Sequence, residues 1–333
     1  MKKILTLILF SMMIFSCSND DTQIIEKNNG LTYLIIEGNK TNEEVATQIL
    51  EEAGSNTQFV WLQNTTALTN VDLSKITNLV ELKIVNNTQL ASLNISNLKS
   101  VYNNIDVGNN PNLTSLNLTS LIYIGKSFNC NSNSNLATVN LSLLKSCGED
   151  LIISGCYPTN SITNIDLSSL ENVKSRFSII YTLVTVISLP KLISCDFVFQ
   201  IGANSLLNSI NIPVLDAVGN IEIGSNPTLT SLSFPSLTAI GGFYENRIVY
   251  NSSLTSISLP NLTNKPSTFS AYDNALNSSN VNQLLSKFVA INSISSNGST
   301  YKFQNQNPPS PPTGQGIIDK ATLISLGNTV VTD

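Results

Sequence analysis

The chain has 333 residues, of which 41% are hydrophobic and only 12% are charged. Disordered proteins show the opposite composition, so a folded protein is indicated. The 17 basic and 22 acidic residues give a net charge of −5, which argues against nucleic-acid binding. Histidine is absent, and this excludes Ser-His-Asp and Cys-His catalytic sites as well as metal sites that use histidine.

The N-terminus has the pattern of an export signal. Two lysines precede an apolar run over residues 4–15, which is too short to span a bilayer as a helix. Ser16 and Cys17 follow in the manner of a bacterial lipobox, in which the cysteine becomes the lipidated first residue. We therefore predict a signal peptide over 1–16, lipidation at Cys17 and a polar tether over 17–30. An ordinary cleaved secretory signal is the alternative.

Most of the remaining chain is an internal repeat. A motif of the form LxxLxL recurs nine times, and its last apolar residue falls at positions 73, 95, 118, 141, 167, 189, 212, 234 and 259. Such a period, with steps of 22–26 residues, predicts a solenoid, because each repeat buries its apolar face by stacking on its neighbours. Between the motifs, segments such as Leu82-Lys83-Ile84 alternate apolar and polar residues, which predicts strands with one inward face. We expect an all-β dominated repeat solenoid of about nine rungs over residues 68–275.

Asparagine is unusually abundant, with 45 residues, and it occupies one fixed place in the loop after the alternating segments. The residues at this place are Asn87, Asn110, Asn133, Asn204, Asn226 and Asn251. Asparagine tolerates left-handed turns and bonds nearby backbone amides. At a rung spacing of about 4.8 Å, successive side-chain amides can also bond one another. We predict that these asparagines are structural rather than ligand-binding.

Both ends of a solenoid need a cover, because an open end exposes strand edges and apolar core. Residues 31–67 are predicted to form an N-terminal cap and first strands, with a helix that begins at a capping box of Thr41 and Glu44 and ends near Gly54. Residues 276–333 are predicted to form an α+β C-terminal cap. Its expected elements are a helix from Ser278 or Ser279, a strand near Tyr301, a helix over 318–326 and a strand over 329–331. No transmembrane helix is predicted after the repeats.

Several repeats, such as Ser236 to Gly242 (SLTAIGG) and Ile221 to Leu229 (IEIGSNPTL), resemble the L-domain type of leucine-rich repeat found in receptor ectodomains. The whole chain is similar to leucine-rich-repeat surface lipoproteins of Bacteroidota, including the proline-rich tail from Pro308 to Lys320. Ser18 to Asp21 resembles the acidic export signal of that group. The resemblance implies a right-handed coil, lipid-anchored to the outer membrane through Cys17 and exposed at the cell surface.

Four cysteines follow Cys17. Cys147 and Cys195 are assigned to one inward column two rungs apart, about 10 Å, which is too far for a disulfide. Cys130 and Cys156 are assigned to a second inward column on adjacent rungs, about 5 Å apart. A disulfide between Cys130 and Cys156 is therefore one hypothesis, and buried free thiols are the other. No metal-ligand spacing is found.

Few residues suggest chemistry. Asp72 and Asp166 share an outward column but lie four rungs apart, about 19 Å, which is beyond a catalytic carboxylate pair. Glu81 and Asp106 face outward on neighbouring rungs. Trp61 is predicted to face outward beneath the N-terminal helix, with a ligand platform as the alternative reading. A column of threonines suggests an ice-binding face: Thr69, Thr114, Thr163, Thr185, Thr230 and Thr255.

The predicted function is that of a surface-anchored, non-enzymatic recognition or adhesion module. It is expected to bind protein or glycan at the cell surface over a rigid polar face, because a preformed surface loses little entropy on binding. No cofactor is predicted, and the membrane is reached through the N-terminal lipid. The alternatives are a carboxylate-dependent glycan hydrolase or lyase, and a structural envelope protein or ice-binding solenoid. The sequence leaves the binding face and the ligand open.

Overall fold

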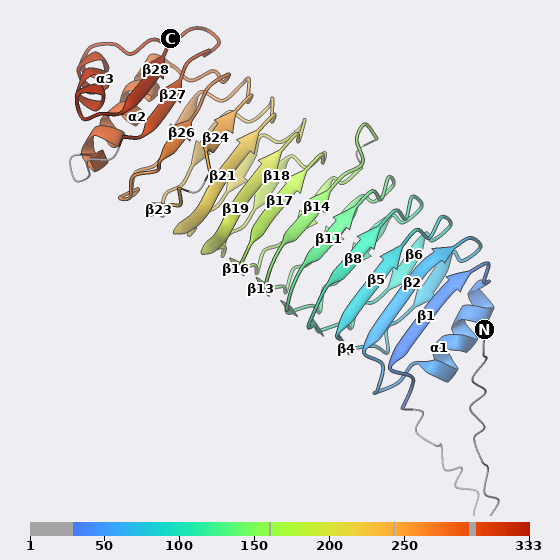
Figure 1. Ribbon diagram of the computed structural model, residues 1–333. Coiled ribbons are helices and arrows are strands. Elements are labelled where there is room, and N and C mark those ends of the chain that lie inside the picture. Colours follow the sequence, from blue (N-terminus) through green and yellow to red (C-terminus); the bar gives the residue numbers. More distant parts are fainter. Residues whose placement is uncertain (1–28, 160, 243, 293–297) are drawn as a thin grey trace, which may run out of the picture.

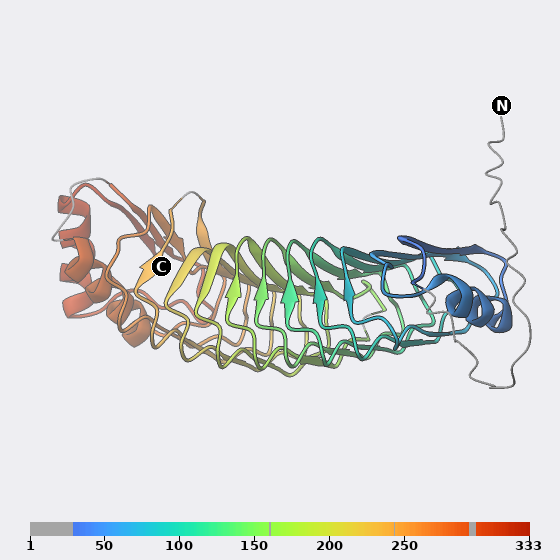
Figure 2. The ribbon, with the colours of Figure 1, turned by 90° about the horizontal axis from the view of Figure 1, so that it is seen from below.

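The computed structural model describes residues 29–159, 161–242, 244–292 and 298–333. These residues wind into a parallel β-solenoid of about 10 turns, an elongated rod whose turns stack side by side (Figures 1 and 2). The predicted signal peptide and the lipidation site at Cys17 lie outside the described residues. The prediction of an all-β repeat solenoid is confirmed.

One face of the rod is a parallel sheet of 19 strands, and its longer strands come from the alternating segments. They are β1 (Tyr33–Gly38), β2 (Phe59–Thr65), β5 (Glu81–Val85), β8 (Ile105–Gly108), β11 (Phe128–Asn131), β14 (Leu151–Ser154), β17 (Arg176–Ile180), β19 (Ser194–Gly202), β21 (Ala217–Gly224), β24 (Asn246–Val249), β26 (Thr268–Ser270), β27 (Thr300–Phe303) and β28 (Thr329–Thr332). Two-residue strands complete it: β4 (Asn78–Leu79), β7 (Ser100–Val101), β10 (Tyr123–Ile124), β13 (Ser146–Cys147), β16 (Asn172–Val173) and β23 (Ala239–Ile240). We call it the large sheet.

The LxxLxL motifs form nine strands of three residues each on another side of the rod. They are β3 (Asn70–Asp72), β6 (Ser92–Asn94), β9 (Ser115–Asn117), β12 (Thr138–Asn140), β15 (Asn164–Asp166), β18 (Val186–Ser188), β20 (Ser209–Asn211), β22 (Ser231–Ser233) and β25 (Ser256–Ser258). These strands pair only in groups of two or three. The large sheet therefore offers the long uninterrupted face, and the motif strands offer a broken one.

The core consists of columns of apolar side chains that run along the rod, one column for each inward-facing position of the repeat. In eight of the nine motif strands the middle residue is buried while its two neighbours are more exposed, as for Leu116 between Ser115 and Asn117; in β15 the middle residue Ile165 is half-buried. In the large sheet, Leu82 and Ile84 are buried on either side of the half-buried Lys83. Period-two alternation thus divides each strand into a core face and a solvent face, as the sequence predicted.

The asparagine ladder is confirmed. All six predicted asparagines are buried, and Asn87, Asn110 and Asn133 are joined by amide hydrogen bonds of 2.9 and 3.1 Å. Each side chain also donates to a backbone carbonyl of the preceding rung, as Asn110 does to Ile84. The ladder starts again at Thr182 and continues through Asn204. It leaves out the irregular rung around 155–159, where the chain contains a cis peptide before Pro158.

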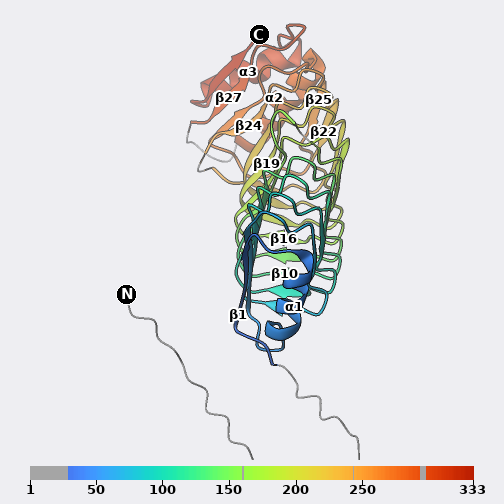
Figure 3. The same cartoon turned by 90° about the vertical axis from the view of Figure 1, so that its right-hand side faces the viewer.

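Helices lie at both ends of the rod (Figure 3). At the N-terminal end, α1 (Asn42–Glu52) starts with the predicted capping box, in which Thr41 and Glu44 exchange hydrogen bonds. Gln48 on α1 also donates to the Ile35 carbonyl of β1 (2.9 Å). At the C-terminal end, α2 (Ser278–Asn292) starts at the predicted serine, and α3 (Gln315–Ser325) starts three residues before the predicted position.

The column assignment of Cys156 is wrong. The strand register places Cys130 opposite Ile153, and Cys156 lies beyond the end of β14 at Ser154. Cys130 is a free, completely buried thiol, so the structure contains no Cys130–Cys156 disulfide. The period was misread because the rung after β14 is longer than its neighbours. The assignment of Cys147 and Cys195 is confirmed, since Val173 stands between them in register.

Candidate functional site

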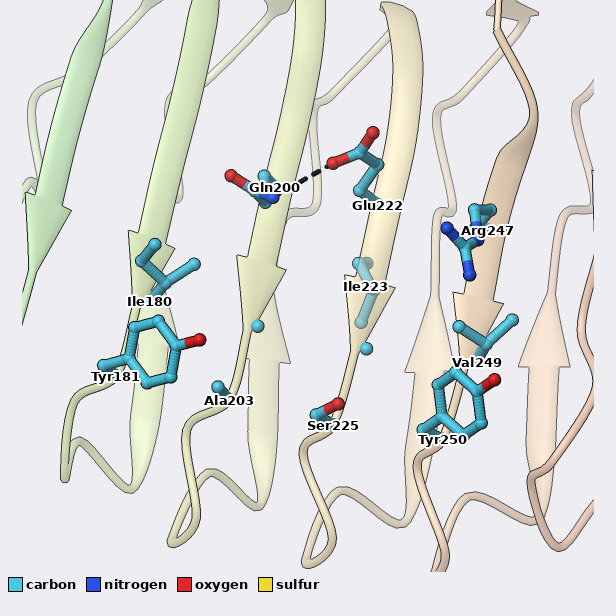
Figure 4. Close-up of a pocket in the computed structure, with 12 residues that line it drawn as sticks. Ile180, Tyr181, Gln200, Ala203, Glu222, Ile223, Ser225, Arg247, Val249 and Tyr250 are labelled. Carbon is cyan, nitrogen blue, oxygen red and sulfur yellow. Dashed lines mark hydrogen bonds between the residues drawn. The ribbon is translucent and has the colours of Figure 1, made fainter. Parts of the chain in front are cut away.

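The outer face of the large sheet is hollowed over β17, β19, β21 and β24, near the C-terminal ends of these strands (Figure 4). The hollow is an open groove of about 300 Å³. Its floor is formed by glycines, its walls by tyrosines and one end by polar side chains, and the residues of each set occupy equivalent positions on successive rungs. The groove therefore arises from a few changes of side chain in an otherwise regular surface.

Glycines form the floor of the groove. Gly202 and Gly224 are register partners on β19 and β21, and the corresponding residues of the flanking strands are Ile180 and Val249. A Cβ atom on Gly224 would lie 3.0 Å from the Val249 carbonyl oxygen. At this point the absence of side chains leaves the backbone of two adjacent strands accessible, and branched side chains rise on both sides.

Two tyrosines form the walls (Figure 4). Tyr181 and Tyr250 occupy the first position after their strands, and the small residues Ala203 and Ser225 occupy this position on the two rungs between them. Three rung spacings separate the tyrosines, roughly 14 Å. Both remain exposed, and Tyr250 packs edge-on against Tyr272.

Tyrosine is an unusual residue for the backbone conformation of this turn. Both tyrosines have left-handed conformations, with φ of 55° for Tyr181 and 60° for Tyr250. In the first rungs the same turn position is held by asparagines such as Asn64 and Asn86, which tolerate this conformation. A bulky residue there costs roughly 1–2 kcal/mol. The left-handed backbone recurs at this position on the two rungs between the tyrosines, at Ala203 (55°) and Ser225 (59°), so it belongs to the fold, whereas the bulky rings are particular to the two edges of the groove.

The asparagine ladder holds the tyrosine-bearing turns in place from below. Asn204 Oδ1 accepts from the Thr182 amide (2.9 Å), directly after Tyr181. Asn226 Oδ1 accepts from the Asn204 amide (3.2 Å), and Asn251, directly after Tyr250, accepts from the Asn226 amide (3.1 Å). The turns that carry the walls and the floor are thus tied to one buried hydrogen-bonded column.

The polar end of the groove consists of Gln200, Glu222 and Arg247. Gln200 accepts from Ser178 (2.8 Å) and donates to Glu222 (3.0 Å), which fixes both side chains. Arg247 donates through Nη2 to the Tyr272 hydroxyl (3.1 Å), and this hydrogen bond raises the pKa of the guanidinium above its ordinary value. The Arg247 side chain extends toward Val249 and Tyr250, whereas Glu222 turns toward Gln200 (Figure 4).

Glu245, two residues before Arg247 in the chain, forms ion pairs with Lys302 and Arg247. Its carboxylate accepts from Lys302 Nζ (2.9 Å) and from Ser270. Partial burial raises the pKa of Glu245, but the hydrogen bonds from Ser270 and Lys302 outweigh this effect and hold the pKa below its ordinary value. Glu245 is thereby kept as a carboxylate engaged with the sheet.

The groove offers aromatic rings and a few polar groups. Of the described residues that line it, only Glu222 carries a carboxylate, whereas glycoside hydrolysis ordinarily uses two. Among the described residues, no group of three or more cysteine, aspartate or glutamate side chains is placed to hold a metal ion. Aromatic walls with a few fixed polar groups are typical of small-ligand sites.

The acidic residues singled out in the sequence do not form a site. Asp72 and Asp166 belong to the separate motif strands β3 and β15. Asp106 is the register partner of Lys83 rather than of Glu81, and it accepts from Asn129 (3.0 Å). Glu81 accepts from Trp61 (2.9 Å). These carboxylates are therefore engaged in structural hydrogen bonds.

Trp61 faces outward as predicted, but its neighbours differ from the expected ones. Its ring packs against Tyr33 and Phe59, with ring centroids 5.7 and 6.4 Å away. Helix α1 instead packs on β1 and β3. The aromatic residues at this end of the large sheet cover one another.

The threonine column runs along the broken face of the rod, where backbone bonds link Thr69 to the next rung at Ala91 and Thr230 to Thr255. Ser and Asn side chains flank it on the motif strands. Because these strands pair only in twos and threes, the surface is interrupted. The ice-binding alternative gains no support from this geometry.

Sequence reasoning did not find the groove. Neither Tyr181 nor Tyr250 is among the residues singled out from the sequence. A usable signal was present: tyrosine replaces asparagine at the turn position, and glycine ends two consecutive alternating segments at 202 and 224.

Comparisons of the chain with protein-family models, with curated proteins and with solved structures find no match. Within the described parts of the chain, no helix combines the length and the apolar character needed to cross a membrane.

Proposed function

We propose that this protein is a non-enzymatic recognition module that binds a glycan in the groove between Tyr181 and Tyr250. The observation that carries this proposal is the pair of exposed tyrosines in left-handed turns on both sides of the Gly202–Gly224 floor. The separation of the rings, roughly 14 Å, is too large for them to enclose one small cation together. It suits a short oligosaccharide that contacts both rings.

The mixture of side chains favours a sugar over a purely apolar ligand. The C–H faces of a sugar ring pack on the electron-rich faces of tyrosine rings. Its hydroxyl groups need donors and acceptors, which Gln200, Glu222 and Arg247 supply in fixed positions. Because the sheet holds these groups in advance, little conformational entropy is lost on binding.

A glycan array probed with the purified protein tests the proposal. Tyr181→Asn and Tyr250→Asn remove one ring each and keep a residue that tolerates the left-handed backbone. Each should weaken binding to the array hits by roughly 3- to 10-fold. Tyr123→Ala is the matched control, because Tyr123 is similarly exposed and lies outside the groove. Array hits unaffected by both groove variants would place the binding site elsewhere.

Attachment at the cell surface is also part of the proposal. The lipobox at Cys17, the tether over 17–30 and the resemblance to leucine-rich-repeat lipoproteins of Bacteroidota support an outer-membrane lipoprotein that presents the solenoid outward. Cys17→Ser should release the protein from the membrane fraction without altering its circular dichroism. Protease shaving of intact cells tests exposure: protein cut only after lysis would contradict surface display.

A further inference from the structure

Arg247 is the one basic residue among the described residues that line the groove, and its orientation is informative. Its register partner on the next strand is Glu222, which would be the obvious ion-pair partner. Glu222 is instead held by Gln200 (3.0 Å), and Arg247 extends toward Val249 and Tyr250 (Figure 4). The guanidinium is thereby placed beside a tyrosine wall, and its ion pair is a long one with Glu245 (Nε–Oε2 4.0 Å) rather than with Glu222.

The described residues leave part of the hydrogen-bonding capacity of Arg247 unused. Nη2 donates to the Tyr272 hydroxyl, but Nε is buried and has no hydrogen-bond partner among the described residues. Oε2 of Glu245 is 4.0 Å from Nε, beyond hydrogen-bond distance, and Glu245 is bound to Lys302 and Ser270. Because Nε is buried beside Glu245, a ligand in the groove would meet the Nη groups of Arg247, whose side chain is 43% exposed.

The residue type points the same way. The chain has two arginines and fifteen lysines, and one of the two arginines lies in the groove. A guanidinium presents donors in a planar fork that matches a carboxylate, whereas an ammonium does not. The Tyr272 hydrogen bond restricts the orientation of this fork before a ligand arrives.

We propose that the groove selects an acidic glycan, in which the carboxylate of a uronic acid binds the Arg247 guanidinium while the ring of that sugar lies against Tyr250. This inference rests on the proposed function and specifies its ligand class. Glu222 and Ser225 then accept hydrogen bonds from hydroxyl groups of the adjoining sugar. Because Glu222 is one strand away, it disfavours a second carboxylate directly beside the first.

The test uses uronic-acid oligosaccharides of the glucuronate, galacturonate and alginate types, each paired with its carboxyl-reduced neutral counterpart. Calorimetry with the purified protein should show at least one acidic oligosaccharide binding about 10- to 100-fold more tightly than its reduced form. Arg247→Gln should remove this difference, so that the variant binds the acidic and the reduced form with equal affinity. Arg247→Lys should retain only part of it, because the charge remains and the fork is lost.

Arg176 is unsuitable as a control, because its Nη1 donates to Gln200 of the groove (3.5 Å). Lys83→Gln serves instead, because Lys83 is a basic residue on the same face of the sheet, on β5 outside the groove. It should leave the preference for the acidic form intact. Circular dichroism of each variant checks the fold. The preference should also shrink as salt is added, since Arg247 is partly exposed.

The outcomes separate the two levels of the proposal. Equal binding of acidic and reduced forms, or array hits confined to neutral or sulfated glycans, would overturn the uronic-acid inference while the groove remains a glycan site. A preference that survives Arg247→Gln would overturn it as well. The absence of any glycan hit on the array would remove the proposed function together with its ligand class.

Discussion

Asn87 donates from its side-chain amide to the side-chain carbonyl of Asn110 (2.9 Å), and both side chains are completely buried. The same carbonyl oxygen accepts from the Asn87 backbone amide (3.2 Å). The Asn110 amide group in turn donates to the carbonyl of Ile84 and to Asn133. One side chain therefore satisfies polar groups on three rungs, which explains why asparagine recurs at this position of the repeat.

Asn110→Ala should destabilise the solenoid strongly. The change removes the acceptor of the Asn87 backbone amide and of one of the two Asn87 side-chain N–H groups, and it removes the side-chain donor to the Ile84 carbonyl, at about 1–3 kcal/mol for each buried group. We expect a loss of several kcal/mol in chemical denaturation. Asn109→Gly is the control, because Asn109 is exposed and has a left-handed backbone that glycine adopts freely. Equal stability of the two variants would contradict a structural ladder.

Leu116 tests the core register. Its side chain is 1% exposed in the middle of the rod. Leu116→Ala should cost roughly 2–5 kcal/mol by leaving a cavity. Leu116→Asp should cost more, because it buries a carboxylate without a partner. Leu143, 51% exposed, provides the control, and Leu143→Asp should shift the thermal midpoint little. An unchanged midpoint for Leu116→Asp would rule out the inward assignment.

The buried thiols should be inert. Burial raises the pKa of Cys130 and of Cys195 to about 12, and that of Cys147 to about 11. At pH 8, roughly one Cys147 thiol in a thousand is then ionised, and fewer at the other two sites. In protein that carries Cys17→Ser and Cys156→Ser, a thiol reagent should titrate no thiol in the native state and three in guanidinium chloride. Rapid native reaction would show that the core opens readily.

Glu245 should make the protein sensitive to acid. Its pKa is held below the ordinary value of 4.5, so its contribution to stability is complete above pH 4.5 and is lost as the pH falls through the lower folded-state pKa. Glu245→Gln should therefore lower the thermal midpoint at pH 7 and have a diminishing effect in acid. If the thermal midpoints of wild type and Glu245→Gln instead differ by the same amount at every pH, then Glu245 contributes nothing to the pH dependence of stability.

Tyr181→Asn should separate stability from binding. Tyr181 has a left-handed backbone, which asparagine adopts at lower cost. Relief of the left-handed backbone opposes the loss of the ring contact with Tyr157 (centroids 5.7 Å apart), so we expect the free energy of unfolding to change by less than about 1 kcal/mol while glycan binding weakens. Val186→Asn is the control, because Val186 is exposed on a motif strand outside the groove. It should change neither the glycan affinity nor the structure of the groove. A clear loss of stability in Tyr181→Asn would mean that the ring has a packing role instead.

The sequence alone determined the repeating architecture. Each repeat of 22–26 residues carries the same apolar columns, and it can bury them only by stacking on its neighbours around a shared core. The same prediction therefore follows from every repeat. The buried asparagines, the capping box at Thr41 and the inward column of Cys147 and Cys195 were predicted because each depends on local spacing. The same reliance on spacing failed at Cys156, where one longer rung shifts the register.

Only the tertiary structure decided which face is continuous and where a ligand site lies. The LxxLxL motif dominates the sequence pattern, yet the large sheet comes from the less conspicuous alternating segments, because pairing across rungs depends on how successive turns align. The groove brings together Tyr181, Gly202, Glu222 and Tyr250 from four rungs. In the sequence these residues are about twenty positions apart, and stacking at roughly 4.8 Å per rung makes them neighbours.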